Sequence, residues 1–146
     1  MADLEELQIR RATLQDMEEI EVLLQELIGN ALVDRRKFFI KAFSSENYAG
    51  LLAECGKEAV GYVDLWGFPD PGHGAVLGVI LNFIVLKDHR KKGIGDRLLE
   101  EAVKEAKRRD FKEFHVWTEF ENEPAKAIYR KHGFTNESLV LEREFD

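Results

Sequence analysis

Apolar and polar positions change their spacing along this chain, and each change predicts an element. Residues 7–11 alternate between apolar and polar side chains, which is typical of a strand. After a start signal at Thr13, apolar positions recur at helical spacing until Gly29 and Asn30 end this first helix. A second, shorter helix is expected over residues 34–43, where apolar side chains share one face. The first part of the chain therefore predicts one strand followed by two helices.

Strand-like patterns fill the middle of the chain. Residues 48–55 and 59–66 are rich in β-type side chains, and the turn between them at residues 56–57 indicates a hairpin. Residues 68–74 contain two prolines and two glycines, which predicts a loop. The run over residues 76–86 is almost continuously apolar, as in a central strand that is buried on both faces.

The last part of the chain returns to alternating elements. A helix is expected after Gly95, then a strand over residues 113–118 and a last helix that starts near Pro124 and closes at Gly133. Residues 138–145 are expected to form a terminal strand. The resulting order is β-α-α-β-β-β-α-β-α-β, which predicts a single α/β domain over residues 1–146 with a mixed β-sheet flanked by helices.

A basic, glycine-containing turn joins the long central strand to the helix after it. Gly93 and Gly95 carry no Cβ, so a ligand can approach the backbone N–H groups, and the start of a helix attracts an anion. Between residues 87 and 97, five cations accompany two acids in a chain whose net charge is −7. These features indicate a phosphate site. The alternative is a tight turn with solvated cations.

Composition and spacing exclude several function classes. The sequence contains no Walker A loop, and G-x-G-x-x-G fails because Leu98 stands where the third glycine belongs. The acidic net charge speaks against a nucleic-acid binder with a broad basic surface. No apolar stretch approaches the ~20 residues of a membrane span, so we expect a cytoplasmic protein. Cys55 is the sole cysteine and the histidines lack ligand spacing, so no metal site is expected.

Two motifs lie at the turn and in the last helix. The pattern [QR]-x-x-G-x-[GA] is matched by Arg90-Lys91-Lys92-Gly93-Ile94-Gly95. The pattern N-x-x-A-x-x-x-Y-x-x-x-G-F is matched by Asn122, Ala125, Tyr129, Gly133 and Phe134. With the order of elements, they make the chain resemble the GNAT superfamily of acyl-CoA-dependent N-acyltransferases over nearly its whole length. The phrase Asn122-Glu123-Pro124 is also similar to diamine and spermidine acetyltransferases.

The resemblance implies that acetyl-CoA is the cosubstrate and that it lies where the central strand separates from its neighbour. The implied contacts come from Val85, Arg90, Lys91, Lys92, Gly93, Ile94, Gly95, Asp96, Asn122 and Ala125. Backbone N–H groups of the turn would meet the pyrophosphate, and Val85 would offer backbone groups to the pantetheine arm or the thioester carbonyl. Asn122 has a second interpretation as a helix N-cap, and both roles are compatible.

Tyr129 is the catalytic candidate that the resemblance implies. CoA leaves as a thiolate after an amine attacks the thioester, and a phenol with a reference pKa of about 10 can donate a proton to it. The alternative is a tyrosine whose ring simply packs in the core.

The usual general bases of the family are missing. Many members carry a glutamate four residues before the Val85 equivalent, where this chain has Leu81, or five residues before the asparagine, where it has Trp117. The remaining candidates are a water chain, which Asn82 could orient, or one of the carboxylates and histidines Asp64, Glu54, Glu119 and His73. Aromatic side chains at strand ends are candidates for the acceptor side: Trp66, Phe68, Trp117 and Phe120.

These observations predict an N-acetyltransferase that moves an acetyl group to a primary amine by direct attack in a ternary complex. The alternative is an acyl-CoA-binding regulatory module without catalysis, and a phosphate- or nucleotide-binding protein outside the family ranks last. The acceptor is a small-molecule amine or a peptide amine, and composition does not choose between a polyamine, an amino acid, an aminoglycoside and a protein N-terminus. A homodimer is expected as the commonest small oligomer.

Overall fold

A computed structural model describes residues 6–29 and 33–146 and shows one open, mixed β-sheet between two layers of helices. The strands are β1 (Leu7–Arg11), β2 (Tyr48–Cys55), β3 (Glu58–Asp70), β4 (Ala75–Ile80), β5 (Phe83–Val85) and β6 (Glu113–Val116). The α-helices are α1 (Met17–Ile28), α2 (Arg36–Phe43), α3 (Ile94–Arg108) and α4 (Glu123–Lys131). The predicted fold class, a mixed α/β sheet flanked by helices, is confirmed.

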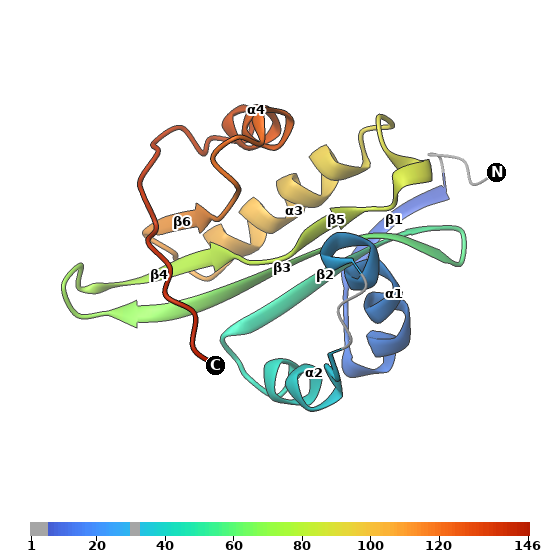
Figure 1. The fold of residues 1–146 in the computed structure, drawn as a ribbon, viewed down its shortest axis with the longest axis horizontal. Coiled ribbons are helices and arrows are strands. Elements are labelled where there is room, and N and C mark those ends of the chain that lie inside the picture. The colour runs from blue at the N-terminus through green and yellow to red at the C-terminus, as the bar shows by residue number, and fades with distance from the viewer. Residues whose placement is uncertain (1–5, 30–32) are drawn as a thin grey trace.

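The sheet has the strand order β1-β2-β3-β4-β6, and β5 pairs with β3. Neighbouring strands are antiparallel except β4 and β6, which run parallel. Figure 1 shows α3 and α4 on one side of the sheet and α1 and α2 on the other. Each side has its own apolar core: Leu98 and Leu99 of α3 are fully buried on one face, and Ile20 and Leu23 of α1 on the other. These helices stay on the sheet because each buries one apolar face.

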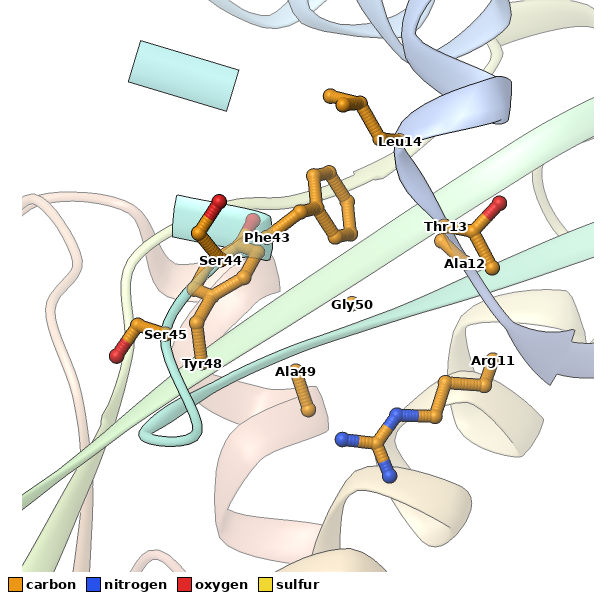
Figure 2. A pocket seen from close by; sticks show the side chains of 10 residues that line it. All are labelled: Arg11, Ala12, Thr13, Leu14, Phe43, Ser44, Ser45, Tyr48, Ala49 and Gly50. Atoms are coloured by element: carbon orange, nitrogen blue, oxygen red, sulfur yellow. The ribbon is translucent and has the colours of Figure 1, made fainter. Parts of the chain in front are cut away.

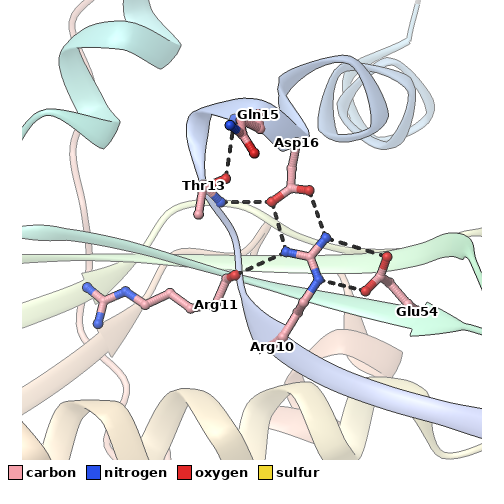
Figure 3. Close-up of polar contacts among 6 residues, drawn as sticks. All are labelled: Arg10, Arg11, Thr13, Gln15, Asp16 and Glu54. Atoms are coloured by element: carbon pink, nitrogen blue, oxygen red, sulfur yellow. Dashed lines mark hydrogen bonds and ion pairs between the residues drawn. The ribbon is translucent and has the colours of Figure 1, made fainter.

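A polar cluster fixes the entry into α1 (Figure 3). Arg10 of β1 donates from Nε to Glu54 of β2 at 2.7 Å and from Nη2 to Asp16 at 2.7 Å. Asp16 also accepts from the backbone N–H of Thr13, whose own hydroxyl accepts from the N–H of Gln15, so the short 3-10 turn over Leu14–Asp16 that leads into α1 is capped. The bonds from Arg10 hold the pKa of Asp16 below its usual range. The cluster therefore joins two strands to the start of the first helix.

The hairpin between β3 and β4 is longer than the sequence predicts. Residues 68–74 are predicted as a loop, but β3 continues to Asp70 and pairs Pro69 with Val76. This end of β3 extends beyond β2, whose pairing ends at Trp66. A proline is tolerated there because its missing N–H faces an edge without a partner strand.

The central strand predicted over residues 76–86 is two strands. β4 ends at Ile80, Leu81 and Asn82 belong to no strand, and β5 begins at Phe83. The pairing with β3 continues across the break, so the chain still runs through the middle of the sheet. No glycine or proline marks the position, which is why the apolar pattern alone suggested one strand.

The predicted terminal strand over residues 138–145 is wrong. Residues 135–146 form neither helix nor strand, although Figure 1 shows them running past β6. Leu139, Leu141 and Phe145 are 80%, 84% and 81% exposed, respectively. A strand needs a hydrogen-bonded neighbour, and the described chain offers this segment none. Its alternating pattern therefore does not decide its structure.

Candidate functional site

A cleft opens where the parallel strands β4 and β6 separate. Their pairing ends at Ile80 and Val116, and β5 continues next to β3 without a partner from β6. The space beyond measures roughly 1830 Å³ and is bounded by β5, the turn after it, the end of β6, α4 and the C-terminal segment. Separation of two neighbouring parallel strands thus creates a large cleft at this edge of β4.

The turn at residues 90–96 brings a row of backbone donors to one wall of this cleft. Lys91 and Gly93 have φ angles of 63° and 82°, which turns successive N–H groups toward one side. Within the described chain, no hydrogen-bond acceptor is found for the N–H groups of residues 91–96, the last three of which begin α3. Such a row of free donors at a helix start is suited to a phosphate.

Close packing explains the second glycine of the turn. A Cβ on Gly95 would lie 3.2 Å from the Phe83 ring and 3.4 Å from the Ile128 side chain. The start of α3 can therefore approach both β5 and α4 only without a side chain at this position. Gly93 has open space around it, so what demands glycine there is the positive φ angle.

The side chains of the turn brace the site and leave the N–H groups free. Arg90 donates from Nε to the carbonyl of Val85 at 2.9 Å and pairs with Glu26 of α1 at 3.5 Å. Asp96 accepts from His132 Nε2 at 2.8 Å and pairs with Lys131 at 3.1 Å, and the bond from His132 lowers the pKa of Asp96. The turn is thereby held to α1 on one side and to α4 on the other.

Val85 presents its backbone to the cleft. Leu86 donates to the carbonyl of Val60, and Asp64 donates to the carbonyl of Asn82. In an antiparallel pair the bonded positions alternate, so the N–H and C=O of Val85 point away from β3 toward the open side. Because Arg90 already occupies the carbonyl, the N–H is the backbone group of Val85 that remains for a ligand.

The structure gathers the predicted cosubstrate contacts, with one exception. Arg90, Lys91, Gly93, Ile94, Gly95 and Asp96 all border the cleft, as do Val85, Asn122 and Ala125, whereas Lys92 does not. Asn122 caps α4, because its Oδ1 accepts from the N–H of Ala125 at 3.2 Å. That cap leaves the side-chain N–H₂ of Asn122 available at the cleft, so both interpretations of this residue remain compatible.

Tyr129 lies on α4 and reaches the cleft from a largely buried position. The residue is 8% exposed, and its ring packs at 5.9 Å from Phe83 and 6.1 Å from Phe134, measured between ring centroids. In the described part of the chain its hydroxyl has no hydrogen-bond partner, and Tyr129 borders the cleft. Burial raises its pKa to about 12, so the phenol keeps its proton at neutral pH. Tyr129 is thus a core residue at the edge of the cleft.

Three of the four candidate bases are occupied elsewhere. Glu54 pairs with Arg10, and the carboxylate of Asp64 is buried and accepts from Asn82 and from Tyr48. His73 lies in the β3–β4 hairpin, where it pairs with Asp70 and, at 3.0 Å, with Glu113. Only Glu119 borders the cleft, and no ion pair to it is found among the described residues.

Two of the four aromatic candidates border the cleft and two do not. Trp117 and Phe120 border the cleft and are 55% and 79% exposed, and Lys126 lies 4.5 Å from the Phe120 ring centroid. Trp66 instead packs on Tyr48, with ring centroids 4.8 Å apart, and Phe68 lies outside the cleft lining. The cleft thus has two exposed aromatic rings in its lining, both from the segment after β6.

Sequence reasoning misses two histidines, one that holds the turn and one that borders the cleft. His132 holds Asp96, as described above, and His89 borders the cleft with a buried Nδ1 that has no partner in the described chain. Neither has a spacing signal. Their positions depend on how the turn and α4 meet in space.

A second, smaller cavity of roughly 210 Å³ lies away from this cleft (Figure 2). It is bounded by the segment from β1 to α1, the end of α2 and the start of β2, and its lining includes Arg11, Ser44 and Ser45. The Ser44 hydroxyl already donates to the carbonyl of Ile40, and Ser45 accepts from the N–H of Asn47. No motif residue borders this cavity, so the β4–β6 cleft is the candidate active site.

Comparisons with known proteins agree with this geometry. The Acetyltransferase (GNAT) family model matches residues 13–134, and the chain belongs to this family. It is 31% identical over 142 residues to an N-alpha-acetyltransferase of Sulfolobus acidocaldarius. The aligned region covers 91% of this chain and 82% of that relative. The fold matches an aminoglycoside acetyltransferase from an uncultured soil metagenomic sample, with a TM-score of 0.85, 18% identity and coverage of 98% and 97%. It also matches the aminoglycoside N-acetyltransferase AAC(6')-Iy in complex with CoA, with a TM-score of 0.82, 18% identity and coverage of 94% of each chain.

The protein is therefore an acetyl-CoA-dependent acetyltransferase, and its cleft fits that cosubstrate. The free N–H groups of residues 91–96 are suited to a pyrophosphate, and the cleft leading away from them is lined largely by apolar side chains of β5 and α4. In the described part of the chain, no helix is long and apolar enough to cross a membrane.

Proposed function

We propose that this protein transfers an acetyl group from acetyl-CoA to the α-amino group of a polypeptide by direct attack within a ternary complex. The observation that carries the proposal is the convergence on one cleft of free backbone donors at residues 91–96 and the unpartnered hydroxyl of Tyr129. The free N–H groups bind the cosubstrate, and the Tyr129 hydroxyl donates a proton to the leaving thiolate. The acceptor enters beside Trp117 and Phe120.

Acetyl-CoA supplies the acetyl group as a thioester. A bond forms between the amine nitrogen and the acetyl carbon while the bond from that carbon to sulfur breaks. The N–H of Val85 stabilises negative charge on the carbonyl oxygen, and Tyr129 donates its proton to the departing thiolate. The proton lost by the amine passes to water or to Glu119, and solvent returns a proton to Tyr129.

The lack of a dedicated base favours an α-amine over an alkyl amine. Leu81 and Trp117 are unable to accept a proton, and Glu119 is the one carboxylate among the four candidates that borders the cleft. An α-amino group has a pKa of about 8, against about 10.4 for a lysine side chain, so far more of it is neutral at pH 7. An amine that is already partly neutral at pH 7 has the least need of a base in the site to remove its proton.

The relatives support the same acceptor. The Sulfolobus acidocaldarius protein is named an N-alpha-acetyltransferase and aligns with nearly the whole of this chain. The solved aminoglycoside acetyltransferases share the fold at much lower identity, so they support the architecture more than the acceptor.

A thiol-release assay over matched acceptors tests the proposal. We expect a short peptide with a free α-amine to react at least roughly a hundredfold faster at pH 7 than the same peptide with a blocked N-terminus and a free lysine. Spermidine and an aminoglycoside complete the panel. Release with either of these and none with the free α-amine would overturn the proposed acceptor, while release with no amine at all would overturn the proposed reaction.

A further inference from the structure

We propose that Asp64 of β3 is a positioning residue that keeps the cleft open, because its buried carboxylate fixes the break at which β4 passes into β5. This inference rests on the cleft being the reaction site. Asp64 borders no part of the cleft itself and acts through the residues opposite it. The evidence comes from the strand register, from the hydrogen bonds at the break and from the side chains beyond it.

The register shows one extra residue next to the pair formed by Asp64 and Asn82. Trp66 pairs with Val79 on one side of the break, and Val63 pairs with Phe83 on the other. Residues 80–82 therefore face only residues 64–65 of β3, which is the arrangement of a β-bulge. A bulge bends the strand that carries it, and here the bent strand is the one that leaves β6.

Asp64 accepts the hydrogen bonds that the bulge leaves unpaired. Its Oδ1 accepts from the backbone N–H of Asn82 at 2.8 Å, and its Oδ2 accepts from the side-chain N–H₂ of Asn82 at 2.7 Å. The N–H of Leu81 also stabilises the charged carboxylate. The backbone N–H of Asp64 completes the contact by donating to the carbonyl of Asn82 at 2.9 Å. A carboxylate suits this position because it only accepts and can receive several donors at once.

The cost of burying this charge indicates that the contact has a purpose. Asp64 is 3% exposed, and burial raises its pKa, an effect that the donors at Asn82 and the Tyr48 hydroxyl at 2.7 Å oppose. A strand interior is ordinarily filled with apolar side chains, and a buried carboxylate is tolerated only with its partners in place. Without the carboxylate, the N–H of Asn82 in the half-buried bulge would lose its acceptor.

If the bulge were lost, β5 would shift by one residue against β3, and the wall of the cleft that β5 forms would change. A slip of one residue reverses which side every side chain and backbone group of β5 faces. The side chains of Phe83 and Val85 border the cleft in the present register, and the N–H of Val85 points toward it. After a slip that N–H would turn toward β3. Asp64 therefore holds the alignment on which the proposed carbonyl contact depends.

Three variants separate positioning from general stability. Asp64→Ala removes every acceptor at the bulge, and Asp64→Asn keeps one oxygen for the N–H of Asn82. The control is Tyr62→Phe, which removes a buried hydroxyl from the same network, where it contacts the Tyr48 hydroxyl at 2.6 Å. Each variant is measured for thermal unfolding, for kcat and KM with acetyl-CoA and the best acceptor of the panel, and for amide hydrogen exchange at Leu81 and Asn82.

We expect Asp64→Ala to lower kcat by roughly tenfold to a hundredfold and to expose the amides of Leu81 and Asn82 to exchange. Asp64→Asn should recover part of both losses. Tyr62→Phe should unfold at a lower temperature yet keep kcat within about twofold of the wild type. If Asp64→Ala does not fold, Asp64→Asn carries the comparison with Tyr62→Phe.

Unchanged exchange at both amides, or a kcat loss in Tyr62→Phe equal to that of the Asp64 variants, would overturn the inference. The exchange measurement needs no acceptor. If the wild-type protein acetylates none of the tested amines, exchange at the bulge still decides whether Asp64 holds the break, so a failure of the proposed acceptor is distinguishable from a failure of this inference.

Discussion

Two polar regions of the molecule differ in where their partners lie. In the cluster of Arg10, Asp16 and Glu54, the charged groups find their partners within the chain, at distances down to 2.7 Å (Figure 3). At the turn of residues 90–96, the N–H groups of residues 91–96 find none in the described chain. The first region has its hydrogen bonds complete, whereas the second has donors arranged side by side and unused.

The difference separates groups that stabilise the fold from groups that serve a ligand. Backbone donors that are left free in an ordered turn indicate that something outside the chain accepts them. The side chains around that turn support this interpretation, because Arg90 and Asp96 bind neighbouring elements and leave the N–H groups exposed to the cleft. Substitutions in the two regions should therefore affect different properties.

The largest effect is expected for Tyr129→Phe. The ring contacts with Phe83 and Phe134 remain, so the fold and acetyl-CoA affinity should stay nearly unchanged. Loss of the proton donor should lower kcat by roughly tenfold to a thousandfold. Steady-state kinetics and calorimetric titration with acetyl-CoA measure the two quantities. An unchanged kcat would remove the phenol from the chemistry.

A smaller effect is expected for Gly93→Val, and it should appear in binding. Gly93 has a φ angle of 82°, which a β-branched residue rarely adopts, so the substitution should displace the free N–H groups. We expect the Kd for acetyl-CoA to rise roughly tenfold or more. Gly74→Val is the matched control, since Gly74 has a φ angle of 60° in the distant β3–β4 hairpin. Equal losses of affinity in both variants would show that the effect is general strain.

The sequence predicts the structure well where residues with local roles mark an element, and poorly where the structure depends on distant contacts. The turn and α4 are marked by glycine, proline and capping residues with local roles, so their sequence predicts their structure: Gly93 has a positive φ angle, and Asn122 caps α4. The bulge between β4 and β5 has no such local marker. It depends on a carboxylate on another strand, 18 residues earlier in the sequence.

The C-terminal segment has a sequence pattern that predicts a structure it does not form. Residues 138–145 carry an alternating pattern that is typical of a strand, yet they form none. Alternation states which side chains could share a face, but pairing requires a neighbour whose free edge matches. Likewise Glu54 and His73 were plausible bases in the sequence, and their distant partners Arg10 and Glu113 could not be read from it.

The smallest effect on activity is expected for Arg10→Met, which should change stability instead. The variant loses charge-assisted bonds to Asp16 and Glu54 in a partly exposed position, so the free energy of unfolding should fall by about 1–2 kcal/mol with kcat unchanged. The bonds from Arg10 lower the pKa of Asp16, so this stabilisation is complete above the unfolded pKa of about 3.9 and is lost as pH falls through the lower folded value. Urea unfolding at pH 7 and at pH 3 should therefore show a larger difference in the free energy of unfolding between wild type and variant at pH 7.

Arg36→Met, at an exposed position of α2, is the control and should shift the free energy of unfolding by less than about 0.5 kcal/mol. A loss of kcat in Arg10→Met at full folding would mean that this cluster also serves the reaction, and the contrast between the two regions would fail.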